Sequence, residues 1–379
     1  MWDVHLWAQS FRGTLDDIFD IQEDVSVKIV EALRLQLSSE EKVTLQKRYT
    51  DNTEAYQLYL QGIFFWKKRN EQGLTLAIKF FERALEKDPD YALAWAGIAD
   101  TLSLMGEYTN LSRRDLYKKQ MDAVHRALEI DPQLAEAHIS LAISLMLNDW
   151  DWAGAEREFK LGLQLDPKNA TGHHWYAELL FFIGKPKEAF KEIDIAVELD
   201  PVSQGILKDK GIFQYYMEQY DEAMETALTT LEIDPGFVPV HRLISLAYTG
   251  KEMYQEAINE TIKWGSLTGN KIKTDVALAH IYAVSGREDE ARKIIENTGI
   301  EKMLSSNDYR GVALVYAALG ETDEAFEWLE KSYQKHEESL CSIGIDPKFD
   351  SIRDDPRFNE ILKKVGLSTK SNIRSTSKS

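Results

Sequence analysis

The sequence predicts an all-α protein: a right-handed superhelical solenoid of about eight helix-turn-helix repeats, with a short strand and helix before the repeats and a helical cap after them. The first observation behind this prediction is an alanine that recurs at a constant step of 34 residues, at Ala155, Ala189, Ala223, Ala257, Ala291 and Ala325. The second is that proline and glycine keep the same step, at Pro167, Pro201 and Pro235 and at Gly286 and Gly320. A fixed period of this length is typical of units that bury their apolar faces only by stacking on their neighbours.

Each period contains the pattern of two helices. Over residues 170–183, apolar side chains recur at three- and four-residue steps, which predicts an amphipathic helix. Gly184 is expected to end this helix, because a C-terminal cap favours a residue with backbone freedom. A second helix is expected over about 187–198, and the "LDP" that follows ends it because the residue before proline avoids helical geometry. Ala177 and Ala189 are placed where the two helices cross, and their small side chains let the backbones approach.

This unit resembles the tetratricopeptide repeat, whose period is 34 residues. In the family's frame four positions are replaced and three match. The replacements are His173 for Trp, Tyr176 for Leu, Ala177 for Gly and Ile193 for Phe, and the matches are Ala189, Ala196 and Pro201. The resemblance implies an array over 54–338, divided approximately into units 54–91, 92–134, 135–169, 170–203, 204–237, 238–271, 272–305 and 306–338. The unit 92–134 carries nine extra residues around "EYTNLSRRD", and the unit 54–91 has a slightly long turn.

The two ends of the chain do not follow the period. Residues 1–50 contain a predicted strand, "VHLWAQSF", and an amphipathic helix. They resemble the closing strand and helix of the TolB-like α/β domain that precedes such repeats in large bacterial signalling proteins; the alternative is a strand and helix that shield the first repeat. Residues 339–367 are expected to form a helical cap with the apolar side chains of Phe349, Ile352, Phe358, Ile361 and Leu362, and 368–379 a disordered tail.

Composition excludes several classes of protein. A net charge of −18 over 379 residues repels a phosphate backbone, so we expect no nucleic-acid partner. Cys341 is the single cysteine, which favours a reducing compartment. The N-terminus lacks the pattern of a signal peptide, and apolar stretches such as "AELLFFIG" are too short to span a bilayer. We therefore expect a cytoplasmic protein without membrane insertion.

No catalytic signature is found in the sequence. Phosphate-binding glycine loops, kinase motifs and the G-x-S-x-G elbow are absent. His138, His173 and His241 occupy one position of the repeat, which favours a packing role. His174 and Glu178, four residues apart on one helix, offer two metal ligands, fewer than a metal site needs. The prediction is a protein that is not an enzyme, with no cofactor, no catalytic residues and no metal.

The resemblance also implies a candidate groove, because in the family the first helix of each repeat lines the concave face. The corresponding positions are His174, Glu178, Phe181, Phe182, Lys208, Ile212, Tyr215, Tyr216, Arg242, Leu246, His280 and Arg310. The hypothesised anchor for a peptide is the aromatic cluster of Phe181, Phe182, Tyr215 and Tyr216, since aromatic residues are enriched at interface hot spots. The alternative is that some of these rings pack between adjacent repeats.

Two functions follow from this interpretation. The first is an interaction scaffold that binds a peptide segment or a helix of another protein in the groove. The alternative is the regulatory or sensory part of a bacterial signalling protein, such as an adenylate or guanylate cyclase, a serine/threonine kinase or a transcriptional regulator, whose output domain is missing.

Overall fold

The computed structural model describes residues 49–109, 111, 113–299, 302–303 and 308–368. The strand and helix predicted within residues 1–50, and the tail beyond Ser368, lie outside the described residues. The described chain is helical and forms eight antiparallel helix pairs followed by a C-terminal segment. The pairs are α3 (Thr53–Trp66) with α4 (Glu71–Lys87), α5 (Ala92–Tyr108) with α6 (Arg113–Ile130), α7 (Ala135–Ser144) with α8 (Trp152–Leu165), α9 (Ala170–Phe182) with α10 (Pro186–Leu199), α11 (Gln204–Tyr216) with α12 (Tyr220–Ile233), α13 (Val240–Gly250) with α14 (Tyr254–Thr268), α15 (Lys271–Val284) with α16 (Glu288–Thr298), and α18 (Tyr309–Ala318) with α19 (Thr322–Gln334).

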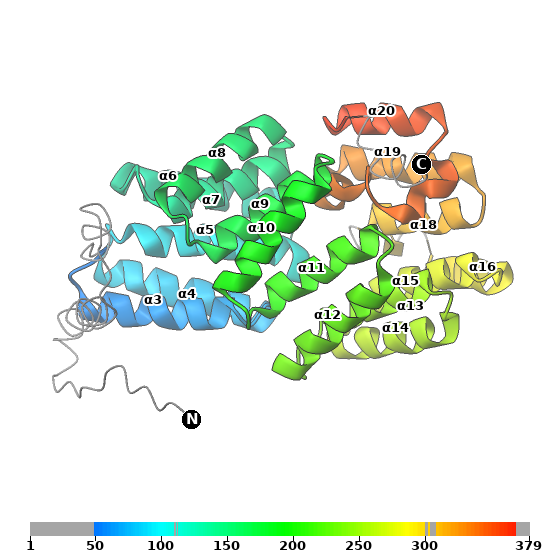
Figure 1. Cartoon of the computed structure of the whole chain (residues 1–379), viewed down its shortest axis with the longest axis horizontal. Coiled ribbons are helices and arrows are strands. Elements are labelled where there is room, and N and C mark those ends of the chain that lie inside the picture. Colours follow the sequence, from blue (N-terminus) through cyan, green and yellow to red (C-terminus); the bar gives the residue numbers. More distant parts are fainter. Residues whose placement is uncertain (1–48, 110, 112, 300–301, 304–307, 369–379) are drawn as a thin grey trace, which may run out of the picture.

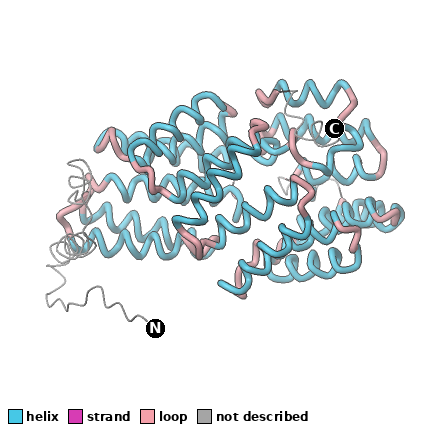
Figure 2. The backbone as a smooth tube through the Cα atoms, in the orientation of Figure 1, coloured by secondary structure: helices cyan, strands magenta, loops and turns pink. Residues whose placement is uncertain are grey.

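Successive pairs stack side by side and turn as they advance, so that the last pairs lie beside the middle of the array rather than at the far end of a straight rod (Figure 1). Short loops join the helices, and no strand occurs in the part of the chain that is described (Figure 2). The predicted all-α helical repeat fold is thereby confirmed.

The turn inside each pair repeats in its backbone geometry. A residue with positive φ occurs at steps of 34 residues, at Trp150 (53°), Gly184 (82°), Glu218 (61°), Glu252 (59°), Gly286 (77°) and Gly320 (76°). This left-handed conformation closes the first helix, and it costs a residue with a side chain roughly 1–2 kcal/mol. Glycine at three of these positions is thus explained, and the three other units carry a strained backbone at the same place.

Small residues lie at the helix crossings, as the sequence indicates. Ala177 on α9 and Ala189 on α10 are fully buried. Gly62 on α3 has the same role, because a Cβ atom there would lie 2.4 Å from the ring of Phe81 on α4. The close approach of the two helices in each pair therefore depends on the absence of larger side chains.

Replacing Ala189 by Leu is expected to lower the free energy of unfolding by about 1–3 kcal/mol, because three added carbon atoms overpack the crossing. Equilibrium unfolding in urea measures the change. Ala153→Leu on α8 is the matched control, since Ala153 is exposed and should tolerate the same substitution. Equal stability of the two variants would contradict this account of the crossing.

The units 135–169 and 92–134 are both longer than the 34-residue period. The spacing from Pro132 to Pro167 exceeds the period by one residue, and the extra residue is absorbed by a π-helical turn, η2 (Leu145–Asp149), at the end of α7. In the unit 92–134, helices α5 and α6 have 17 and 18 residues, whereas α9 and α10 have 13 and 14. The sequence suggested that the extra residues lie around the turn; most of them instead lengthen both helices.

The C-terminal segment consists of η3 (Glu338–Ser342), η4 (Pro347–Ile352) and α20 (Pro356–Lys364). All of the apolar side chains expected in a cap are buried there, namely Phe349, Ile352, Phe358, Ile361 and Leu362. They share one core cluster with residues of α18 and α19. The segment therefore covers the apolar edge of the last repeat.

The C-terminal segment also contacts the third repeat, far away in the sequence. The indole of Trp150 stacks on the ring of His336 with 3.7 Å between centroids, and Trp152 Nε1 donates to the carbonyl of Val365 at 2.8 Å. The Cys341 thiol is buried and donates to the Met146 carbonyl at 3.7 Å. The array is thus closed onto itself through the irregular turn η2.

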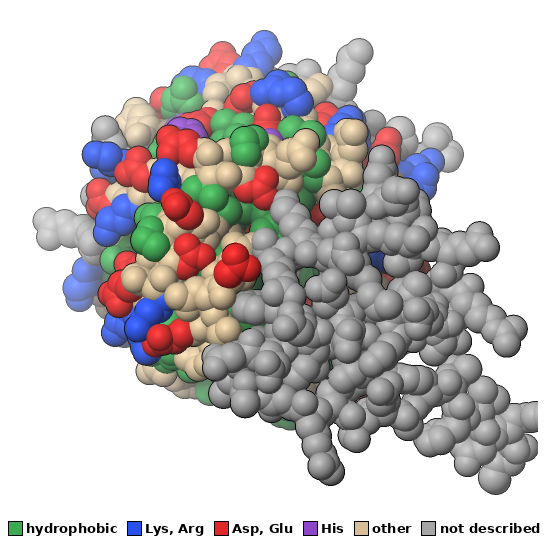
Figure 3. All heavy atoms as spheres, turned by 90° about the vertical axis from the view of Figure 1, so that its left-hand side faces the viewer, with side chains coloured by type: hydrophobic (Ala, Val, Ile, Leu, Met, Phe, Trp, Pro, Cys, Tyr) green, Lys and Arg blue, Asp and Glu red, His purple; other side chains and the backbone are tan. Residues whose placement is uncertain are grey.

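The end of the molecule near α3 and α4 carries acidic, basic and apolar side chains interspersed over its described part (Figure 3). Among the described helices, none combines the length and the apolar character needed to cross a membrane.

Candidate functional site

The segment that follows α19 lies against the first helices of several repeats. Leu340 and Ile343 are fully buried, and Ile345 packs into the core cluster that spans the N-terminal repeats. Tyr216, on α11, hydrogen-bonds Ser342 within this segment. The face that the sequence identified as an open groove is therefore partly filled by the chain's own residues.

Asp346 anchors this segment electrostatically. Its carboxylate is fully buried and accepts a hydrogen bond from Arg310 Nη2, while Lys348 Nζ lies 3.5 Å away. Burial acts to raise the pKa of Asp346, but Lys348 and Arg310 outweigh it and hold the pKa at about 2. Asp346 is therefore ionised at neutral pH and neutralises part of a cluster of cations.

Beside this segment lies a cavity of about 870 Å³. One wall consists of α5 and α6 with the turn between them, and the other of α13 to α15 and the start of α18. We call it the main cavity; its charged residues include Arg242, Lys273, Asp308, Arg310, Lys335, Glu337, Glu338 and Lys348. A cavity of this size suits a ligand or a few side chains of a partner.

The residues of the candidate groove separate into three sets. Arg242, His280 and Arg310 line the main cavity. His174, Glu178, Phe182 and Lys208 line a smaller cavity of about 200 Å³, on whose other side stand Glu338, Ser339 and Ser342. The remaining residues, Phe181, Ile212, Tyr215, Tyr216 and Leu246, line neither of these two cavities.

The four rings expected to anchor a peptide are buried or half-buried. Phe181 is fully buried and stacks on Phe213 of the next repeat, with 4.4 Å between ring centroids, and Tyr215 is 4% exposed. Leu246 is also buried, and Ile212 and Tyr216 are half-buried beside the core of the middle repeats. These side chains therefore hold adjacent repeats together, which is the packing alternative. Of the four rings, Phe182 lines a cavity.

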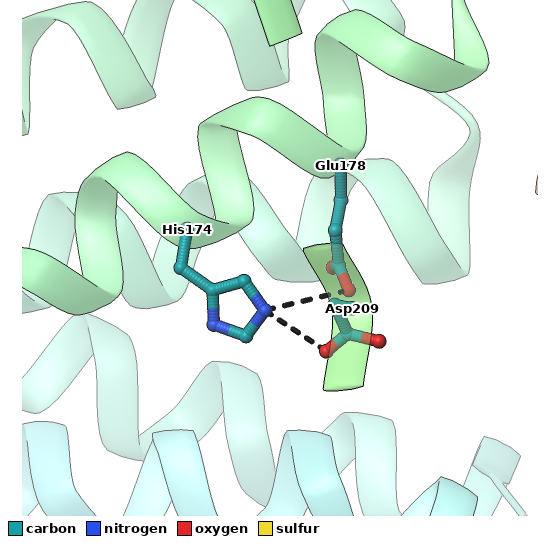
Figure 4. Close-up of side chains that lie close together, drawn as sticks. All are labelled: His174, Glu178 and Asp209. Carbon is teal, nitrogen blue, oxygen red and sulfur yellow. Dashed lines mark hydrogen bonds and ion pairs between the residues drawn. The ribbon is translucent and has the colours of Figure 1, made fainter. Parts of the chain in front are cut away.

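Figure 4 shows that the pair His174 and Glu178 gains a third polar neighbour, Asp209 of α11. His174 Nε2 lies 2.9 Å from Asp209 Oδ2 and 3.9 Å from Glu178 Oε1. The ammonium of Lys208 lies 3.0 Å from the other oxygen of Asp209 and supplies the positive charge that a metal ion would bring. Burial, with the nearby cations Arg69 and Lys208, lowers the pKa of His174, so its ring is neutral at pH 7. A hydrogen bond between His174 and Asp209 thus joins two repeats, and the ion pair of Asp209 with Lys208 lies within α11.

The histidines at the consensus Trp position have a shared structural role. His138 Nε2 and His173 Nε2 lie 3.1 and 3.0 Å from the carbonyls of the prolines six residues earlier, and Trp95 Nε1 donates to the equivalent Pro89 carbonyl at 3.0 Å. The other ring nitrogen binds a glutamate on the second helix, at 2.9, 2.6 and 2.9 Å for His138, His173 and His241. Histidine replaces tryptophan here because both can provide this N–H group.

Several residues of the main cavity were not identified from the sequence. Gly106, Thr109 and Tyr117 come from the lengthened helices α5 and α6, and Lys348 comes from the C-terminal segment. The nine extra residues of the unit 92–134 were the available signal, because an insertion in a regular array places new side chains on one face. Nothing in the period indicates that residue 348 returns to this face.

Parts of the chain are similar to three named proteins. The chain is 29% identical over 142 residues to "Putative adenylate cyclase 3" of Rhizobium meliloti (strain 1021), and the matched segment covers 37% of this chain and 24% of that protein. It is 25% identical over 168 residues to the Hsp70-Hsp90 organizing protein of Triticum aestivum (44% and 26%), and 24% identical over 174 residues to tetratricopeptide repeat protein 6 of Homo sapiens (45% and 30%). The matched segment thus spans about a quarter of the length of these relatives. No family model matches the chain.

Solved structures share the fold. An IFIT1 monomeric mutant superposes with a TM-score of 0.52 at 14% identity, covering 94% of this chain and 91% of that one. The N-terminal resemblance to the TolB-like domain has no support among these comparisons. The 34-residue period, the antiparallel helix pairs and the named relatives agree: the chain has an all-α helical repeat fold and is similar to tetratricopeptide repeat proteins.

Proposed function

We propose that this protein is an interaction scaffold that binds a segment of a partner protein at the mouth of the main cavity. The observation that carries the proposal is the cavity itself: it remains open on the face of the array lined by first helices, although the chain's own C-terminal segment fills the neighbouring part. A partner's side chains would enter where that segment does not reach.

The mouth of the main cavity has the composition of an interface. Leu111 is 52% exposed, and Trp264 is half-buried with the guanidinium of Arg242 5.9 Å from its ring centroid. Tryptophan and arginine are enriched among the residues that dominate binding energy. The names of two relatives, a tetratricopeptide repeat protein and an organizing protein of two chaperones, agree with a scaffold.

Trp264→Ala is expected to weaken capture of the partner by roughly tenfold or more, because it removes the largest apolar contact at the mouth. The full chain would be immobilised and exposed to an extract of its native host, and captured proteins quantified by mass spectrometry. Affinity for an identified partner would then be measured in solution.

The matched control is Phe64→Ala, which truncates an aromatic side chain that is 56% exposed on α3 and does not line the main cavity. A partner retained by this variant and lost by Trp264→Ala supports the site. Identical capture by both variants and the unchanged protein would contradict it.

The match to the Rhizobium protein favours a second candidate function, as a regulatory segment of a signalling protein. In that case the partner segment would belong to an output domain encoded with the repeats. Reading the DNA upstream of the codon for Met1 tests this: an in-frame cyclase, kinase or winged-helix sequence supports it, and an unrelated gene or a stop codon opposes it.

A further inference from the structure

The inner wall of the main cavity contains polar groups without partners. His280 is 9% exposed and its buried Nε2 has no hydrogen-bond partner among the described residues. The same holds for the buried Nε of Arg310, whose Nη2 donates to Asp346. A buried donor without a partner costs free energy, so such a group marks a place where a ligand atom would be stabilising.

Arg242 adds a positive charge to this wall, and Asp308 is the carboxylate with the largest effect on it. It comes from α13, it is half-buried, and within the described part of the chain its guanidinium has the Trp264 ring as its contact and no hydrogen bond or ion pair. Lys348, from the C-terminal segment, is 11% exposed in its side chain and has Asp346 as its counterion. Asp346 thus serves two cations at once.

The charges that face the main cavity are unequal. Five Lys and Arg side chains line its described surface against three carboxylates, Asp308, Glu337 and Glu338. Burial, reinforced by Asp308, raises the pKa of Glu337 to about 7, which removes part of that negative charge near neutrality. The excess is positive, although the whole chain carries a net charge of −18.

Burial is the main cause that disfavours the charged forms of Arg242, His280 and Lys348 on this wall. Burial, with Arg310 and Arg242 nearby, lowers the pKa of Lys348 to about 8, and burial with Lys348 and Arg242 nearby lowers the pKa of His280 to about 3. Burial also lowers the pKa of Arg242. A bound anion would favour the charged forms of Arg242 and Lys348 and accept hydrogen bonds from Arg242 and from Nε2 of the neutral imidazole.

We propose that the inner wall of the main cavity, formed by Arg242, His280, Arg310 and Lys348, binds a small multivalent oxyanion, a compound with a diphosphate or polycarboxylate group. The inference goes beyond partner binding, and the two sites share Arg242, whose guanidinium lies 5.9 Å from the centroid of the Trp264 ring at the mouth. A ligand of this kind gives the scaffold a small-molecule input on the face where its partner would bind.

The experiment uses the full chain at pH 7 with two probes, sodium pyrophosphate and sodium citrate, against sodium chloride of equal ionic strength. Thermal unfolding and titration calorimetry measure binding. At least one probe is expected to raise Tm, and Arg242→Gln is expected to lower its affinity by roughly tenfold or more, because a charge-assisted hydrogen bond is lost. Arg292→Gln, an exposed arginine on α16, is the matched control and should bind as the unchanged protein does.

The outcomes separate the possibilities. Binding of pyrophosphate alone indicates a phosphate ligand, and binding of citrate alone a polycarboxylate. Failure of both probes, or binding that Arg242→Gln leaves unchanged, overturns the proposal. If circular dichroism shows that Arg242→Gln does not fold, the affinity for the probes is measured instead with Lys273→Gln, at the edge of the same cavity. Loss of partner capture in Trp264→Ala with oxyanion binding intact would leave the two sites independent.

Discussion

Replacing Asp346 by Asn is expected to lower the free energy of unfolding by about 3–5 kcal/mol, because two buried cations lose their shared counterion. The change preserves the shape of the side chain and the oxygen that accepts from the Lys348 backbone N–H at 3.0 Å. What it removes is the negative charge beside the Arg310 guanidinium and the Lys348 ammonium. Chemical denaturation followed by circular dichroism at pH 7 measures the loss.

A control separates this effect from the general cost of removing an ion pair. Asp221→Asn breaks the pair with Lys251 on the surface, where the Asp221 side chain is 84% exposed, and such pairs contribute about 0–1 kcal/mol. If both variants lose the same small amount, Asp346 does not hold the C-terminal segment in place.

The dependence of the folding free energy on pH provides a second test of the role of Asp346. Its pKa is about 2 in the folded protein and about 3.8 when unfolded, so its ionisation stabilises the fold above pH 3.8. That contribution is lost as the pH falls from 3.8 through 2. Asp346→Asn should remove this part of the acid dependence, whereas Asp221→Asn should leave it.

The fold was predictable because its determinants are local and repeated. The position of Ala189 is a fully buried alanine in six units, and the position of Gly184 has positive φ in six units, so each occurrence in the sequence reinforces the others. Even the replacement of tryptophan by His173 keeps the hydrogen bond to the proline carbonyl that fixes the start of the helix. A solenoid is nearly one-dimensional, and its pattern therefore shows in the sequence.

The depth of individual side chains was not predictable in the same way. Phe181 occupies a position that faces the groove in the family's frame, but it is covered by Phe213 of the next repeat at 4.4 Å. Whether an aromatic ring lies at the surface depends on the size of the side chains that the next repeat packs against it. A sequence position therefore identifies the face of a helix, and it does not say how far neighbouring repeats cover that face.

The closure of the array was missed for a different reason. Trp150 and His336 belong to no shared period, and each looks like an ordinary turn residue within its own unit. Both adopt positive φ, a conformation that costs free energy and persists where surrounding contacts compensate for it. The irregular third unit was the sign that something other than the repeat acts on this turn.

Trp150→Ala is expected to destabilise the protein by about 3–5 kcal/mol, the usual range for truncating a buried tryptophan. Trp150 is 8% exposed, and its indole stacks with the rings of His336 and Tyr333, at 3.7 and 5.7 Å between centroids. Its loss removes a contact that holds the C-terminal segment against the third repeat. Hydrogen exchange should therefore accelerate in residues 338–352 and in α7 more than in α13 and α14.

A second variant at the same position separates the ring from the backbone. Trp150→Gly also deletes the indole, but glycine adopts a φ of 53° without the strain of roughly 1–2 kcal/mol that alanine retains. We therefore expect the glycine variant to be the more stable of the two, while both show the same accelerated exchange in 338–352. Stability of Trp150→Ala within about 1 kcal/mol of the unchanged protein, the level expected for exposed Phe64→Ala, would contradict the closure as a stabilising contact. The lining of the main cavity includes Asn148 of the third repeat and residues 334–339, which the closure holds together. A variant that opens the closure should therefore also weaken binding in the main cavity.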